Sequence, residues 1–183
     1  GNFATSGALT STGTLTKNGS GTLTLSGTVA NSYGASLIND GTVILGKTDG
    51  LNALGQGAIT IGDGTGSAGS AVVQLAANNQ IADYAPSVTF NSDGRLDLNG
   101  FNESLNIISG SGQIALGSGS TLTLGVSSGS STYSGVISGA GSFAKSGSGT
   151  VTLDGASSNT YLGTTTVNEG TLALAKTGGA TAI

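Results

Sequence analysis

The chain has 183 residues and a net charge of −4; 34 residues are glycine and only 8% are charged. It contains no His, Cys, Met or Trp, which excludes Ser-His-Asp and Cys-His catalytic triads and the usual structural zinc sites. The five cations are scattered along the chain and form no basic patch for nucleic acid: Lys17, Lys47, Arg95, Lys145 and Lys176.

Apolar residues alternate with small or polar ones along most of the chain, and this period of two predicts β-strands. In chain order the alternating runs are 22–25, 43–45, 58–61, 73–75, 95–98, 113–116, 121–124, 151–153 and 171–174. Nearly every run is followed by Gly, Asn-Gly or Asp-Gly, residues that tolerate positive φ and turn the chain. The gaps between runs vary widely, so they do not give the strand register.

An internal repeat covers residues 13–46 and 141–175. Residues 13–33 match 141–161 without a gap at an offset of 128, and the match resumes after one inserted residue, Leu162. We expect the glycines to serve turns, and Lys17 and Lys145 to be solvated at strand ends. The motif positions are Lys17, Gly19, Gly21, Leu23, Leu25, Gly27, Tyr33 and Gly41 in the first copy, and Lys145, Gly147, Gly149, Val151, Leu153, Gly155, Tyr161 and Gly170 in the second.

Recurring short strands, glycine turns and a long-period repeat together predict a β-solenoid, with residues 1–183 forming a single segment. Among solenoids we favour a parallel β-helix. At a strand spacing of about 4.8 Å, roughly eight rungs would give a rod about 40 Å long. A β-sandwich is the alternative, but four Tyr and four Phe without any Trp are few for a core about 10 Å thick.

The repeat resembles the passenger-associated transport repeat of bacterial autotransporters. The resemblance lies in the pattern G-x-L-x-K-x-G-x-G-T-L-x-L-x-G, then N-x-Y, then G-x-T-x-V-x-x-G-x-L-x-L. Residues 141–174 carry it best, and residues 13–45 are weaker, with Ser36 and Ile38 in place of Thr and Val. It implies a right-handed parallel β-helix that is part of a longer passenger and is exported by type V secretion through a C-terminal outer-membrane β-barrel.

That resemblance implies a place on the bacterial cell surface, attached through the barrel, or a secreted product. The sequence shows neither a signal peptide nor a barrel, so we expect this segment alone not to insert or export itself. We expect a structural stalk and not an enzyme, with no cofactor and no required metal. Its expected roles are to promote outward translocation and folding and to display an adhesin-like region. Expected partners are the barrel, a host or cell-surface glycan or protein, and other copies end to end.

A charged cluster supports an alternative. Asp93, Arg95 and Asp97 alternate along one predicted strand, so we expect all three to project from one face. Two carboxylates beside an arginine could act on or bind a polysaccharide. The simpler interpretation is a solvent-facing, self-paired strand that contributes little stability.

The remaining motifs indicate weaker alternatives. Four Thr-x-Thr pairs, the first at Thr22 and Thr24, suit an ice- or glycan-binding face, but no continuous threonine face is evident. Residues 125–129 match G-x-S-x-G and residues 64–69 match G-x-G-x-x-G. We expect both to be loops without a site. A catalytic serine needs a histidine, which the chain lacks, and a phosphate site needs a helix N-terminus, whereas a predicted strand follows residues 64–69.

Overall fold

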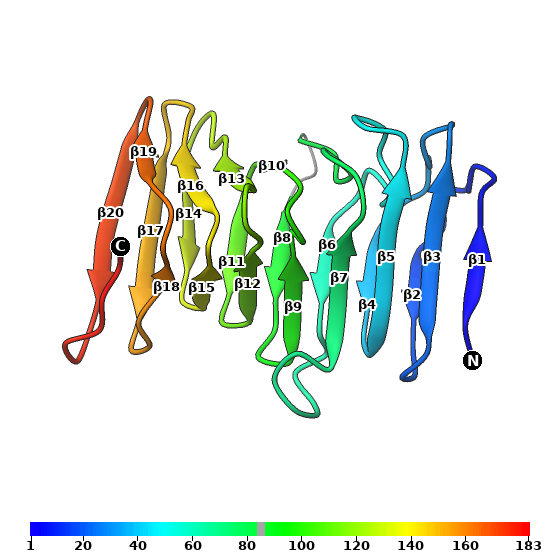
Figure 1. Ribbon diagram of the computed structural model, residues 1–183, viewed down its shortest axis with the longest axis horizontal. Coiled ribbons are helices and arrows are strands. Elements are labelled where there is room, and N and C mark those ends of the chain that lie inside the picture. The colour runs from blue at the N-terminus through cyan, green and yellow to red at the C-terminus, as the bar shows by residue number, and fades with distance from the viewer. Residues whose placement is uncertain (84–86) are drawn as a thin grey trace.

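The computed structural model describes residues 1–83 and 87–183, and in these residues the regular elements are all β-strands. The strands run parallel and stack along one long axis, with the two ends of the chain at opposite ends of the row (Figure 1). The expected all-β parallel β-helix, with about eight turns, is therefore confirmed.

Three parallel sheets form the sides of the solenoid. The first sheet contains β1 (Phe3–Thr5), β3 (Thr22–Gly27), β5 (Gly41–Lys47), β7 (Ala71–Leu75), β9 (Gly94–Asp97), β12 (Gln113–Leu116), β15 (Val136–Gly139) and β18 (Thr160–Tyr161). The second sheet contains β2 (Leu15–Lys17), β4 (Ser36–Ile38), β6 (Ile59–Ile61), β8 (Val88–Phe90), β11 (Ile108–Gly110), β14 (Ser130–Tyr133), β17 (Thr150–Gly155) and β20 (Thr171–Lys176). The third sheet contains β10 (Glu103–Leu105), β13 (Thr121–Leu124), β16 (Ser142–Lys145) and β19 (Thr165–Val167).

The core is a set of columns of aliphatic side chains that run from rung to rung. The strands alternate between inward and outward positions, as in the buried–intermediate alternation of β5 and β7. Register then places one inward residue above the next in the first sheet: Leu23, Val43, Val73, Leu96, Ile114 and Ile137. Identical spacing of parallel strands lets these branched side chains stack in contact.

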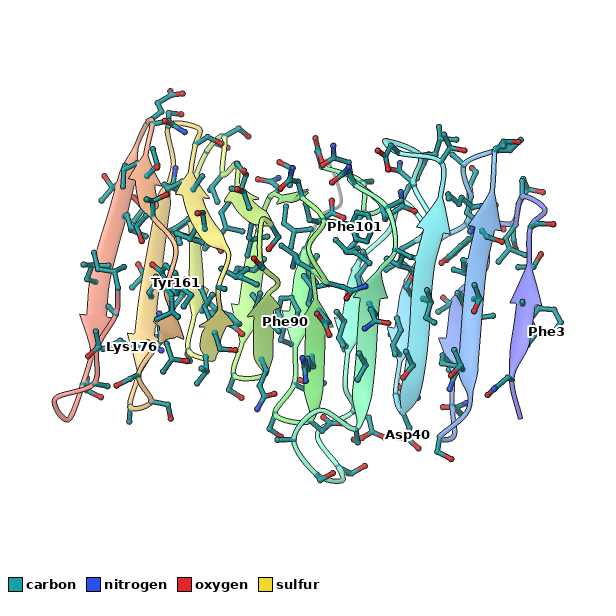
Figure 2. The ribbon with its side chains drawn as sticks, in the orientation of Figure 1. Phe3, Asp40, Phe90, Phe101, Tyr161 and Lys176 are labelled. Atoms are coloured by element: carbon teal, nitrogen blue, oxygen red, sulfur yellow. The ribbon has the colours of Figure 1, made fainter. Side chains whose placement is uncertain are left out.

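Few aromatic residues are needed to fill this narrow core. Phe90 lies in the middle of the stack (Figure 2) and packs edge-on against Tyr133, with ring centroids 5.7 Å apart. The buried Tyr133 hydroxyl donates to the Gly112 carbonyl at 2.8 Å. Phe3, by contrast, projects from the first strand at the end of the row, where it is 66% exposed (Figure 2).

Rung length varies, which explains why the gaps between runs did not give the register. Partners in the first sheet are 20 residues apart at Leu23 and Val43 and 30 residues apart at Val43 and Val73. The long rung contains the glycine-rich loop 62–70, which extends beyond the edge of the stack between β6 and β7 (Figure 1). Loop insertions of this kind leave the ladder intact because they lie outside the paired strands.

The two repeat copies occupy different sides of the solenoid. In the first copy the lysine turn joins β2 of the second sheet to β3 of the first sheet. In the second copy the same turn joins β16 of the third sheet to β17 of the second sheet. The third sheet begins only at β10, so the copies are displaced by one side around the axis. The repeat thus forms a turn between two adjacent sheets, and its local structure is the same whichever two sheets it joins.

Candidate functional site

The first repeat copy encloses a lysine in its turn. Along β2, Leu15 points inward, Thr16 outward and Lys17 inward again, so the period of two directs the Lys17 side chain to the interior. Its Nζ donates to the carbonyls of Asn18 (3.2 Å) and Gly19 (2.5 Å) in its own turn and of Asp40 (2.9 Å) in the next rung. Figure 2 shows Asp40 at this edge of the stack, between β4 and β5.

The second copy reproduces this arrangement at the equivalent atoms. Lys145 ends β16, is fully buried, and its Nζ donates to the carbonyls of Ser146 (2.7 Å), Gly147 (2.6 Å) and Glu169 (3.2 Å). The expectation that Lys17 and Lys145 are solvated was therefore wrong. Three carbonyl oxygens replace the water around each ammonium group, which makes its burial tolerable.

Glycine is required where the next rung closes each lysine turn. Gly170 has a φ of +71°, and a Cβ there would lie 2.4 Å from the carbonyl oxygens of both Gly147 and Gly149. At Gly41 a Cβ would lie 2.6 Å from the Lys17 Nζ. These two motif glycines therefore leave room for the carbonyls and the ammonium, besides supplying the turn conformation.

An asparagine joins three successive rungs in each copy. Asn31 accepts a hydrogen bond from the Leu9 amide (2.8 Å) in the rung before and donates to the Ala53 carbonyl (2.6 Å) in the rung after. Asn159 likewise accepts from the Ile137 amide (2.9 Å) and donates to the Ala182 carbonyl (2.7 Å). The role of this asparagine was not predicted from the sequence, although its recurrence in both copies was a signal.

A second lysine ends the long strand of each repeat. The Nζ of Lys47 donates to the carbonyls of Ser26 (2.9 Å), one rung back, and Gly7 (3.3 Å), two rungs back. The Nζ of Lys176 donates to the Gly135 carbonyl at 2.8 Å, and Gly135 is the equivalent of Gly7 at the offset of 128. Burial lowers the pKa of both lysines.

The other motif positions are packing residues and turn glycines. Leu25, Val151 and Leu153 are fully buried and Leu23 packs partly buried against them. The Tyr33 and Tyr161 hydroxyls contact Ser36 (3.2 Å) and Thr165 (2.5 Å), which are equivalent positions, and burial raises the pKa of both tyrosines. The remaining motif glycines either have positive φ or lie against the backbone of the preceding rung: Gly19, Gly21, Gly27, Gly147, Gly149 and Gly155.

The structure divides the charged cluster. Arg95 and Asp97 do share the outward face of β9 and form an ion pair at 3.2 Å. Asp93 precedes the strand, is 1% exposed, and accepts hydrogen bonds from the amides of Gly64 (2.8 Å) and Asp63 (3.3 Å). The expectation that all three project from one face was therefore wrong, because Asp93 lies in a turn where the period of two does not apply. Its carboxylate anchors the loop 62–70.

The other motifs fall in loops or on separate sheets. Residues 64–69 lie between β6 and β7, and residues 125–129 between β13 and β14. The Thr-x-Thr pairs do not align, since the pair on β3 is in the first sheet and the pair on β13 in the third. Register does align five outward hydroxyls in a column on the second sheet: Thr60, Thr89, Ser109, Thr132 and Thr152. Across residues 1–83 and 87–183, no three His, Cys, Asp or Glu side chains gather as metal ligands.

A known protein family matches the two repeat copies. The family model described as the passenger-associated transport repeat matches residues 15–45 and 143–174, which include both lysine turns and both asparagines. No curated protein and no solved structure matches the chain significantly. In the described part of the chain no helix is long and apolar enough to cross a membrane.

Proposed function

Because the chain carries two passenger-associated transport repeats within a β-solenoid, we propose that it is a stalk segment of a secreted autotransporter passenger. The stalk is non-enzymatic, reaches the cell surface through type V secretion, and holds an adhesin-like region away from the surface. Its partners are an outer-membrane β-barrel of the same polypeptide and a host or cell-surface glycan or protein bound by that region. Other copies of the stalk are a further proposed partner, bound end to end.

The observation that carries this proposal is the repeated set of bonds between rungs. Lys17 and Lys145 each complete their hydrogen bonds with a carbonyl of the following rung, and Asn31 and Asn159 each need a rung on both sides. A folded rung therefore presents unsatisfied polar groups that the next rung satisfies. Each bond to the next rung replaces one to water and contributes about 0.5–1.5 kcal/mol, so adding the next rung is favourable and templated.

This arrangement suits folding that begins after export. A chain that leaves a narrow pore unfolded gains stability rung by rung outside the cell, and each added rung opposes its return. Net outward movement then needs no ATP. The absence of cysteine fits the same route, because a disulfide formed in the oxidising periplasm would block passage of an unfolded chain.

The test uses an antibody to this segment on the native cells. Outer-membrane, soluble and medium fractions are blotted with and without protease treatment of intact cells. The proposal expects a band far larger than 17.4 kDa in the outer membrane that external protease removes, or a shorter species in the medium. A protease-protected cytosolic product would contradict it.

A further inference from the structure

The third sheet begins at β10, and among the described residues the rung before β10 contributes no strand that pairs with it. β10 pairs with β13 on one side only. On its other side lies the irregular segment 76–83, and a side chain replaces the missing ladder there. Glu103, which begins β10 and is 1% exposed, accepts hydrogen bonds from the amides of Gln80 (2.9 Å) and Ile81 (3.3 Å) through one carboxylate oxygen.

Gln80 connects this contact with Glu103 to Lys47 in the N-terminal half. Gln80 is fully buried, and its side-chain oxygen accepts from the Lys47 amide at 2.8 Å while its side-chain nitrogen donates to the Asn78 carbonyl at 3.0 Å. A buried polar column thus runs through three successive rungs. It consists of the Lys47 amide, the side chain and amide of Gln80, and the Glu103 carboxylate. This column spans the place where the solenoid changes from two sheets to three.

No described cation neutralises the Glu103 carboxylate. In the segment 76–83 the titratable group that acts on it is Asp83, a like charge, and from β13 its register partner is the apolar Leu122. The Lys47 ammonium donates to carbonyls of earlier rungs, and Asp49 is held by Asn78 on the surface. Three backbone amides favour the charged form of Glu103, but burial outweighs them and raises its pKa to about 8.

We propose that Glu103 makes the junction between the two-sheet and three-sheet halves a pH-sensitive joint, tight when its carboxyl is protonated and looser as the proton is lost. Opening the segment 76–83 from β10 exposes the carboxyl to water. Between pH 4.5, its ordinary pKa, and about 8 the closed joint holds a proton that the open joint releases. The closed form is therefore favoured at low pH, and opening grows by up to about tenfold per pH unit in this window.

The experiment is hydrogen exchange read by mass spectrometry on the full chain at pH 5.5, 6.5 and 7.5, corrected for the intrinsic exchange rate. Peptides covering 76–83 and 103–105 are compared with reference peptides from β17 and β20. From pH 5.5 to 7.5 we expect the junction peptides to lose about 50- to 100-fold more protection than the reference peptides. In Glu103→Gln the amide oxygen still accepts both hydrogen bonds, so we expect this extra loss to vanish.

Asp83→Asn provides a second variant that leaves Glu103 in place. Removal of the neighbouring negative charge lowers the Glu103 pKa, so the extra loss of protection should end at a lower pH than in the unmodified chain. Equal pH dependence in junction and reference peptides would overturn the proposal. The same extra loss in Glu103→Gln would overturn it too, as would an unshifted profile in Asp83→Asn if Glu103→Gln does not fold.

Discussion

At the scale of single residues, the inward lysines Lys17 and Lys145 are central, because they hold both the turn and the next rung. An ammonium group loses its water when it is buried, and only several well-placed acceptors make that tolerable. Lys145 is fully buried and has three carbonyl partners, two from its own turn and one from the next rung. The side chain therefore fixes the turn and attaches the following rung at once, which explains why the repeat specifies lysine at this position.

Replacing Lys145 by methionine keeps a long apolar side chain but removes every donated bond. We expect Lys145→Met to lower the free energy of unfolding by about 2–3 kcal/mol, because it leaves carbonyls of a partly buried turn without a donor. Urea unfolding of the purified chain measures the change. Lys176→Met is the matched control: this lysine is only partly buried and has one carbonyl partner, so its loss should cost less than about 1.5 kcal/mol. Equal effects of the two variants would contradict the role given to the lysine turn.

The turn glycines of the two copies differ in their surroundings and permit a sharper comparison. Gly19 and Gly147 both have positive φ, +70° and +76°. A Cβ at Gly19 would meet nothing within 4 Å, whereas a Cβ at Gly147 would lie 2.5 Å from the Val126 carbonyl oxygen. Gly19→Ala should therefore cost only the left-handed strain of about 1–2 kcal/mol, and Gly147→Ala clearly more. Thermal unfolding of the two variants distinguishes them, and a larger loss for Gly19→Ala would contradict the packing described.

At the scale of elements, the loop 62–70 depends on a carboxylate outside it. Asp93 is buried and holds the amides of Asp63 and Gly64, while Asp97 is paired with Arg95 on the surface. We expect Asp93→Ala to lower the free energy of unfolding by about 2 kcal/mol and to expose the loop to proteolysis, because two amides lose a charged acceptor. Asp97→Ala should cost less than about 1 kcal/mol. Limited proteolysis and urea unfolding test the pair; a larger loss in Asp97→Ala would point back to a functional surface cluster.

The strands were predictable from sequence where the period of two continued over several residues. Every alternating run named from the sequence overlaps a strand, and the inward positions of β12 and β17 are the expected apolar residues. The internal repeat, with its glycine turns, indicated the solenoid. These features are local, or are visible as self-similarity along the chain.

What the sequence did not predict depends on the register between rungs. Rungs of 20 and 30 residues cannot be inferred from runs that belong to three different sheets. The burial of Lys17 was missed because lysine usually has its charge in water, although its place two residues after Leu15 indicated an inward side chain. Asp93 was misplaced because alternation was extended beyond the start of β9.

At the scale of the whole molecule, the cations face inward or are paired. Lys17, Lys47 and Lys145 are buried, the Lys176 ammonium donates to a carbonyl, and Arg95 pairs with Asp97. Trypsin cleaves after Lys and Arg, so we expect the folded chain to resist trypsin at Lys17, Lys47 and Lys145 and to be digested rapidly in urea. Mass spectrometry of timed digests locates the cuts. Rapid cleavage of the folded chain at Lys17 or Lys145 would show that these turns are open.

Bonds between rungs are proposed to couple folding to export, and export of variants that lack these bonds can be measured in the native cells. The full polypeptide carries Lys17→Met with Lys145→Met, and a control carries Thr16→Ala with Ala144→Ser at the neighbouring outward positions. The amount of passenger that external protease removes from intact cells is then compared. We expect a several-fold loss of surface passenger in the lysine variant and none in the control. Undiminished export of a lysine variant whose purified segment has lost stability would contradict it.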